Sequence, residues 1–263
     1  MILNLGERPR RAVLSYSGTY TTKIITVNGK SYTLYSFTGS GTLTITKKDA
    51  TGVDLWMCGG GSNGQKYRGG GGGYFAQKNG LTMAIGSTYT ITIGGAQGTT
   101  SIAQGGTSIA SASGTTTQNG ASGGGGSGAN DGKTGGTGVG SSTRPFGDGT
   151  NFASLPCAGG GGSGDEKWSD GAPYAWYPGG AGGTNGGNGT AGAAQSTGST
   201  SKDSHGGAGG ATGGGKGQAG NGSNWAQAAT FYGSGGGGGR ISYEDRTSRA
   251  AGYQGVVFMR VPV

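Results

Sequence analysis

The sequence predicts a mostly β and irregular protein without significant α-helix, in which a small β-domain is joined to a bundle of stacked glycine helices. Three observations lead to this fold class. Apolar residues alternate with threonine and serine in the amino-terminal part, glycine accounts for 69 of 263 residues, and glycine runs alternate with aromatic segments. No stretch has the 3.6-residue apolar period of an amphipathic helix.

The β-domain is predicted from the alternation of apolar or aromatic residues with threonine and serine between Val13 and Trp56. This pattern is typical of strands, because successive side chains of a strand point to opposite faces. Asn28-Gly29 is a favoured two-residue hairpin turn, and Gly39-Ser40-Gly41 separates the next two strands. The carboxy-terminal strand is expected to pair with the amino-terminal ones in one sheet. The clearest expected strands are residues 31–37, 42–46, 88–93 and 255–261.

The composition separates this chain from ordinary globular domains. Charged residues make up 11% and apolar residues 30%, against about 25% and 45–50% in a typical domain. So little apolar volume does not fill the core that a chain of this length normally carries. Disorder is the alternative, but 4 tryptophans, 12 tyrosines and 6 phenylalanines argue against it, because disordered chains are poor in aromatic residues. Something other than side-chain burial is therefore expected to hold much of the chain together.

Glycine runs alternate with glycine-poor segments along the second half of the chain. A flexible linker has no reason to interrupt itself with tryptophans. We therefore expect a fibre-attachment domain over residues 1–119 and a glycine-rich domain over residues 120–263, closed by a strand at 255–263. The glycine runs are 59–73, 120–140, 158–164, 179–192, 206–222 and 235–239, and the expected loops are 141–157, 165–178, 193–205, 223–234 and 240–254.

Within two glycine runs, glycine recurs at every third position, from Gly180 to Gly192 and, with Ala129 as the one exception, from Gly120 to Gly138. A left-handed three-residue helix of the polyproline II type makes no internal hydrogen bonds. Its backbone groups point outward, so helices without side chains can approach and bond to one another. Collagen is excluded by the short runs and the 6 prolines. The sequence thus predicts a bundle of polyglycine II helices. The alternative is chance, because glycine at every third position also arises at random where glycine is abundant.

The net charge of +8 is concentrated at the amino-terminal end, where residues 1–50 hold seven basic residues against Glu7 and Asp49. Nucleic-acid binders place basic residues beside stacking aromatics, whereas the tryptophan-rich segments here are near neutral. We interpret the charge as a contribution to solubility or docking, with no nucleic-acid partner. The start MILNLGERPRR has no apolar signal region and no stretch approaches 18 apolar residues, so neither a standard secretion signal nor membrane insertion is expected.

The sequence predicts no enzyme, no cofactor and no metal site. His205 is the only histidine, which leaves little for a catalytic triad or a multi-histidine metal site. Ser62 and Ser122 match G-x-S-x-G about as often as chance predicts at this glycine content, and no strand-to-helix elbow accompanies them. A glycan hydrolase is the weaker alternative and rests on the acidic residues of 165–170. Cys58 and Cys157 are expected to be small packing residues.

Several motifs resemble a known family. Leu55-Trp56-Met57-Cys58 before Gly59-Gly60-Gly61, residues 69–75 and residues 88–95 resemble the glycine-rich domain of many phage and bacterial surface proteins. Residues 255–260 resemble its final strand. The whole chain resembles the distal long-tail-fibre adhesins of T-even-like phages, in which a fibre-attachment region precedes glycine-rich motifs alternating with variable segments. That resemblance implies layered polyglycine helices.

The resemblance also implies a function: a tip adhesin on a trimeric distal tail-fibre protein, assembled in the host cytoplasm and carried on the virion. Its loops would bind an outer-membrane protein or lipopolysaccharide of the host and set the host range. A structural fibre-tip cap or a fibre-maturation chaperone without receptor contact is the alternative. Rigid loop aromatics dominate binding hot spots. The receptor contacts expected are Trp168, Tyr174, Trp176, Tyr177, Trp225, Phe231 and Tyr232, followed by Phe146, Phe152 and Tyr243.

Fibre attachment is expected to use the apolar residues at the start of the chain. The alternative for these residues is a place in the core of an edge strand. For the loop aromatics, the alternative is packing at loop bases or on the glycine layer. The expected attachment residues are Ile2, Leu3, Leu5, Val13, Leu14 and Tyr16.

Overall fold

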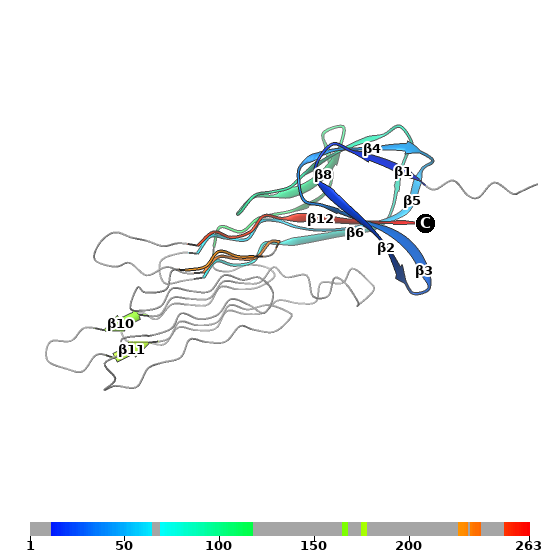
Figure 1. Ribbon diagram of the computed structural model, residues 1–263. Coiled ribbons are helices and arrows are strands. Elements are labelled where there is room, and N and C mark those ends of the chain that lie inside the picture. The colour runs from blue at the N-terminus through cyan, green and yellow to red at the C-terminus, as the bar shows by residue number, and fades with distance from the viewer. Residues whose placement is uncertain are drawn as a thin grey trace, which may run out of the picture.

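The computed structural model describes residues 12–64, 69–117, 226–230, 232–237 and 250–263, together with the backbone of 165–167 and 175–177. These residues form strands, turns and extended segments, and no helix occurs among them (Figure 1). The predicted fold class, mostly β and irregular without significant α-helix, is therefore confirmed.

The described strands form two five-stranded antiparallel sheets and one small hairpin. The first sheet has the order β1-β4-β7-β8-β9, with β1 (Val13–Tyr16), β4 (Gly41–Lys47), β7 (Thr88–Thr92), β8 (Thr100–Gln104) and β9 (Thr107–Ala112). The second has the order β2-β3-β12-β5-β6, with β2 (Tyr20–Val27), β3 (Lys30–Phe37), β12 (Val256–Pro262), β5 (Ala50–Cys58) and β6 (Phe75–Met83). The hairpin pairs β10 (Asp165–Lys167) with β11 (Ala175–Tyr177).

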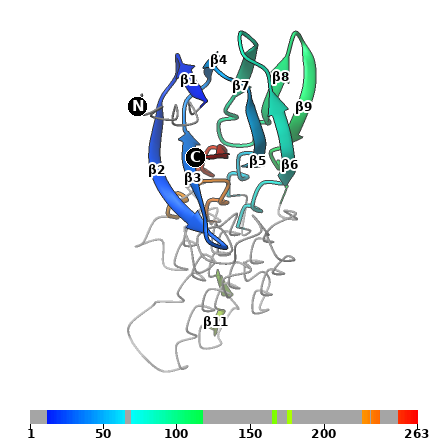
Figure 2. The same cartoon turned by 90° about the vertical axis from the view of Figure 1, so that its right-hand side faces the viewer.

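The two large sheets pack face to face and share one core. Leu43 and Ile91 of the first sheet and Leu55 and Met259 of the second are fully buried in it. Alternation explains the arrangement, because buried and exposed residues follow one another strictly along β7. Figure 2 shows the strands of both sheets around the carboxy terminus, which lies in their midst.

The last strand is the central strand of its sheet. β12 pairs antiparallel with β3 on one side, where Met259 lies opposite Tyr35, and with β5 on the other, where Met259 lies opposite Leu55. The two ends of the chain thus meet in one sheet. Because β12 has neighbours on both sides and apolar clusters on both faces, its residues Val256 to Val261 are all buried.

The predicted hairpin turn at Asn28-Gly29 is confirmed. It joins β2 to β3, and both residues have positive φ, at 48° for Asn28 and 75° for Gly29. A two-residue turn of this kind needs left-handed conformations at both positions, which asparagine and glycine tolerate better than other residues. The expected strands at 31–37, 42–46, 88–93 and 255–261 correspond to β3, β4, β7 and β12.

The sandwich has two distinct ends. At one end, here called the glycine end, β5, β7 and β9 finish and β6, β8 and β12 begin. The described glycine segments continue from this end (Figure 1). At the opposite end, here called the far end, the turns at 28–29, 48–49, 84–87 and 105–106 lie with the carboxy terminus.

Candidate functional site

Six extended segments at the glycine end form a hydrogen-bonded assembly, here called the glycine lattice. Their bonds run from backbone to backbone between segments far apart in sequence. Gly61 N, for example, donates to Tyr253 O at 2.9 Å, and Gly70 N donates to Gly236 O at 2.8 Å. The segments are 59–64, 69–74, 94–98, 113–117, 232–237 and 250–255.

The bonds of the lattice follow a three-residue repeat. Along 59–64, the amides of residues 59 and 62 both donate to segment 69–74, and those of residues 61 and 64 both donate to segment 250–255. Along 69–74, residues 70 and 73 donate to segment 232–237, while residues 71 and 74 donate to segment 113–117. A helix with three residues per turn points every third amide in the same direction. The lattice therefore behaves as a bundle in which one segment bonds to several neighbours.

Glycine is required in the lattice because neighbouring backbones leave no room for a side chain. A Cβ atom on Gly60 would collide with Gly95 O, and one on Gly61 would collide with Ser234 O. The same holds for Gly73 against Gly59 O and for Gly236 against Ala250 O. Since these obstacles are backbone atoms, they do not move aside as a flexible side chain does. The glycines thus serve close approach between chains.

The polyglycine II conformation itself stays a prediction. The two runs from which it was predicted, 120–138 and 180–192, lie outside the described residues. The boundary at 119–120 lies outside them as well. Lattice segments from both sides of that boundary share hydrogen bonds, such as Gly73 N to Gly233 O at 2.7 Å.

Most of the expected receptor contacts fall where the structure describes nothing. Trp176 and Tyr177 belong to β11, and only their backbone is described. In that strand Trp176 lies opposite Glu166 and Tyr177 opposite Asp165, so this part of the 165–178 segment is a hairpin. Outside the described residues are Phe146, Phe152, Trp168, Tyr174, Trp225, Phe231 and Tyr243.

Tyr232 is the expected receptor contact whose side chain is described. It lies where the lattice meets the sandwich and packs partly buried against the cluster that contains Trp56 and Cys58. Its ring meets that of Tyr253 edge to face, with 5.6 Å between centroids. Burial raises the pKa of Tyr232, and the neighbouring Tyr253 and Cys58 raise it further. Whether Tyr232 contacts a receptor stays a prediction.

The expected attachment residues on β1 divide between two faces. Val13 is 41% exposed, whereas Leu14 and Tyr16 pack against the shared core. The Tyr16 hydroxyl donates to Gly39 O, and its ring lies 4.6 Å from that of Phe37. Of the three expected attachment residues on β1, Val13 is therefore the one that is exposed. Ile2, Leu3 and Leu5 lie outside the described residues.

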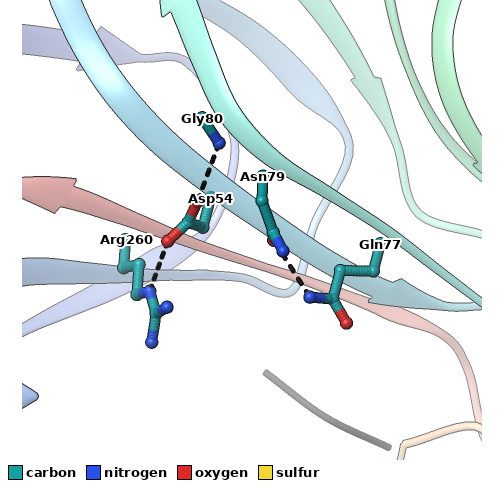
Figure 3. A network of polar contacts seen from close by, with 5 residues as sticks. All are labelled: Asp54, Gln77, Asn79, Gly80 and Arg260. Carbon is teal, nitrogen blue, oxygen red and sulfur yellow. Dashed lines mark hydrogen bonds and ion pairs between the residues drawn. The ribbon is translucent and has the colours of Figure 1, made fainter. Parts of the chain in front are cut away.

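An ion pair joins three strands on the second sheet (Figure 3). Asp54 of β5 accepts a hydrogen bond from Arg260 Nε of β12 at 2.7 Å and another from Gly80 N of β6 at 2.9 Å. The Arg260 guanidinium also lies 5.2 Å from the ring centroid of Tyr32 on β3. Asp54 thus connects β12 to β6 where the register between β5 and β6 is irregular. We interpret the ion pair as a structural contact that stabilises the second sheet.

Sequence reasoning missed the tyrosines exposed at the glycine end. Tyr20 is 39% exposed, Tyr74 44% and Tyr253 37%. Tyr74 directly follows the glycine run 59–73 and Tyr253 follows the single glycine Gly252, and that proximity was the signal available in the sequence. Tyr74, Tyr232 and Tyr253 belong to lattice segments, and Tyr20 begins β2 at the same end of the sandwich, opposite Phe37.

The described residues include no group of three or more histidine, cysteine, aspartate or glutamate side chains placed to hold a metal ion. Nor does any helix among them have the length and hydropathy to cross a membrane.

Comparison with known families accounts for most of the chain. The family model of the glycine-rich domain matches residues 37–262, from the end of β3 to the end of β12. No curated protein matches the sequence. The matched range includes the lattice and the central strand that follows it, and the chain belongs to the glycine-rich domain family.

Proposed function

We propose that this protein is a phage tail-fibre tip adhesin that binds an outer-membrane protein or lipopolysaccharide on its bacterial host. The observation that carries the proposal is the combination of a cross-bonded glycine lattice with glycine-poor aromatic segments that interrupt the glycine runs. Such a lattice is a stiff support for loops, because each of its segments bonds to at least two others. A stiff support lowers the entropy that a binding loop loses when it meets its receptor.

The energetics explain why the lattice is attached to a β-sandwich. A backbone hydrogen bond contributes about 1 kcal/mol net, whereas ordering one residue costs about 1–2 kcal/mol, and glycine costs most. Six isolated glycine segments are therefore unstable. Five of the six segments adjoin a described strand in the sequence, and the sixth, 232–237, is hydrogen-bonded to segments 69–74 and 250–255. The sandwich thus supplies the stabilisation that the lattice lacks.

The absence of an enzymatic role is part of the proposal. Of the three acidic residues that suggested a glycan hydrolase, Asp165 and Glu166 belong to β10 of the small hairpin, and Asp170 lies outside the described residues. The register of this hairpin pairs Trp176 with Glu166 and Tyr177 with Asp165, and a mixture of aromatic and charged residues in one segment suits recognition of a polar cell surface.

The proposal is tested by loop exchange. Replacing residues 165–178 or 223–234 with the corresponding segment of another adhesin is expected to change which bacteria adsorb the particle. The purified wild-type protein is expected to bind intact host cells and to compete with phage adsorption. Unchanged adsorption after both exchanges, with the protein still folded, would refute these loops as the recognition elements.

The same experiment separates an adhesin from the alternative of a structural cap or maturation chaperone. A cap needs the sandwich but not the loops, so deletion of residues 166–176 would leave infectivity intact. An adhesin loses adsorption while still being incorporated into the particle. Quantifying the protein in purified particles alongside the adsorption rate distinguishes the two outcomes.

A further inference from the structure

Three asparagine-glycine pairs lie in the described part of the chain, at 28–29, 63–64 and 79–80. Asparagine before glycine is chemically labile, because the glycine nitrogen can attack the side-chain carboxamide and glycine has no Cβ to hinder the approach. The same chemistry is therefore available at all three pairs. The surroundings of each pair decide how readily it reacts, and the structure gives the three pairs different surroundings.

The pair at 63–64 is held inside the glycine lattice. Asn63 Oδ1 accepts a hydrogen bond from Gly252 N at 3.0 Å, and Gly64 N donates to Ala250 O at 2.8 Å. Gly64 is also buried. Attack by its nitrogen on the Asn63 carboxamide requires both bonds to break, which means that the lattice has to open locally.

The pair at 79–80 is exposed, but it is bonded as well (Figure 3). Gln77 Nε2 donates to Asn79 Oδ1 at 3.0 Å, and Gly80 N donates to Asp54 Oδ1 at 2.9 Å. The nucleophile of the reaction is the glycine nitrogen after it has lost its proton. The Asp54 carboxylate accepts a hydrogen bond from that proton and opposes a second negative charge beside it. This pair is therefore protected without being buried.

The pair at 28–29 has neither protection. It forms the turn between β2 and β3 at the far end, where both residues are exposed. Within the described part of the chain, neither the Asn28 carboxamide nor the Gly29 amide has a hydrogen-bond partner. A Cβ on Gly29 would meet no atom within 4 Å. No hydrogen bond and no packed group thus has to be displaced when the Asn28 side chain turns towards the glycine nitrogen.

We propose that Asn28 is a site of spontaneous deamidation and reacts ahead of Asn63 and Asn79. The Gly29 nitrogen loses its proton and bonds to Asn28 Cγ, the Cγ–Nδ2 bond breaks, and the Nδ2 group takes up a proton and leaves as ammonia. Water then opens the succinimide at one of its two carbonyl carbons and gives aspartate or isoaspartate at position 28. The reaction needs no enzyme, so it advances with the age of the protein. The inference is independent of the proposed function.

The two products differ in their effect on the turn. Aspartate-glycine is itself a favoured two-residue hairpin turn, so the aspartate product keeps the fold. Isoaspartate carries the main chain through its side-chain carbon and lengthens the backbone of the turn by one atom. The pairing of Val27 with Lys30 depends on a two-residue turn, and β2 pairs with β3 alone in its sheet. Isoaspartate is therefore expected to loosen β2, which contributes Ile25 and Val27 to the cluster that contains Trp56.

The test incubates the folded full-length protein at mildly alkaline pH and follows the three asparagines by peptide mass spectrometry. Asn28 is expected to deamidate about tenfold faster than Asn79, because breaking a hydrogen bond to a charged group lowers the reactive population by about that factor. Asn63 is expected to react more slowly still. In urea the three sites are expected to react at similar rates, which is the internal control. If Asn28 reacts no faster than Asn79 or Asn63 in the folded protein, the inference is wrong.

The cause of the difference is tested at the bonded, exposed pair. Asp54→Ala removes the carboxylate that binds the Gly80 amide and is expected to raise the rate at Asn79 about tenfold, with no change at Asn28. Should that variant unfold, Gln77→Ala serves in its place, because it releases the Asn79 carboxamide. An unchanged rate at Asn79 in the folded variant would contradict protection by hydrogen bonds.

The effect on the sheet is tested with Asn28→Gly. Glycine tolerates the left-handed conformation of the turn but has no carboxamide, so this variant keeps the hairpin and does not age. Amide exchange along β2 is expected to become faster in wild-type protein as isoaspartate accumulates and to stay constant in the variant. If exchange along β2 stays equally slow in both while isoaspartate forms, the expected loosening of β2 is wrong.

Discussion

Substituting Gly60 by alanine tests whether the glycine lattice depends on close backbone approach. The added Cβ would collide with Gly95 O and lie 2.9 Å from Gln97 N, closer than real Cβ contacts allow. Both obstacles are backbone atoms, so the segment 59–64 has to move away from 94–98. Gly60 N donates to Gly98 O at 2.8 Å, and Gly60 O accepts from Thr115 N at 3.1 Å, and the movement weakens both bonds.

The magnitude follows from these contacts. Losing two backbone hydrogen bonds costs about 2 kcal/mol at the usual net contribution of each, and forcing a methyl group into a packed interior costs about 1–3 kcal/mol. Replacing glycine by alanine restricts the unfolded chain and returns about 0.4–1 kcal/mol. We therefore expect the free energy of unfolding of the Gly60→Ala variant to fall by about 3 kcal/mol.

The neighbouring Gly95 supplies the control. A Cβ on Gly95 meets no atom within 4 Å, and its φ does not lie in the left-handed region. The Gly95→Ala variant is therefore expected to be as stable as wild type or slightly more stable. Equilibrium unfolding in urea, followed by circular dichroism, measures both. A loss of 3 kcal/mol lowers the urea midpoint by about 1–3 M at typical m-values. Equal midpoints for the two variants would refute the steric account of the lattice.

Three further predictions concern other parts of the structure. Tyr16→Phe removes the hydroxyl that donates to Gly39 O and is expected to lower the free energy of unfolding by about 1 kcal/mol. Burial raises the pKa of Tyr16 from 10.0 to about 12, so the stabilisation by this tyrosine is complete below pH 10 and is lost as pH rises towards 12. Between pH 9 and 12 the free energy of unfolding should therefore fall less steeply in the variant than in the wild type. Asp54→Asn removes the carboxylate that Arg260 Nε binds; the Asp54 side chain is 14% exposed and the Arg260 side chain 9%. The substitution is expected to lower the free energy of unfolding by about 3 kcal/mol. A urea titration that gives wild-type stability would contradict a stabilising role for this ion pair. Amide exchange followed by mass spectrometry should be slower at Gly61, which donates to Tyr253 O, than in the exposed turn at 105–106, and equal rates would argue against a bonded lattice.

Most of the strands that sequence reasoning identified have a clear two-residue alternation of large apolar residues, whereas β12 was recognised as a short continuous apolar run. β7, with Tyr89 and Ile91 buried between exposed threonines, is the plainest case. Three strands, β6, β8 and β9, had no such signal. β6 is an edge strand whose centre is exposed and polar, and β8 and β9 are short and contain small residues. The turn that joins β8 to β9, Gly105-Gly106, has positive φ at both residues. In the sequence it is a pair of glycines among many others, with no strand signal beside it.

The candidate site was less accessible to sequence reasoning. The lattice was expected from a glycine repeat in other parts of the chain, whereas its described segments include stretches such as 94–98 and 113–117 that contain only one to three glycines. Their membership comes from hydrogen bonds to residues distant in sequence.

The sequence by itself determined the properties that depend on a residue and its immediate neighbours. Alternation sets which residues of a strand share a face, Asn28-Gly29 permits the left-handed turn, and abundant glycine removes the side chains that keep backbones apart. Only the tertiary structure decided what each of these residues meets. Gly60 and Gly95 are the same residue in similar local sequence, yet one lies against a backbone and the other faces open space. The difference arises because close packing is a relation between segments, and chain folding alone brings those segments together.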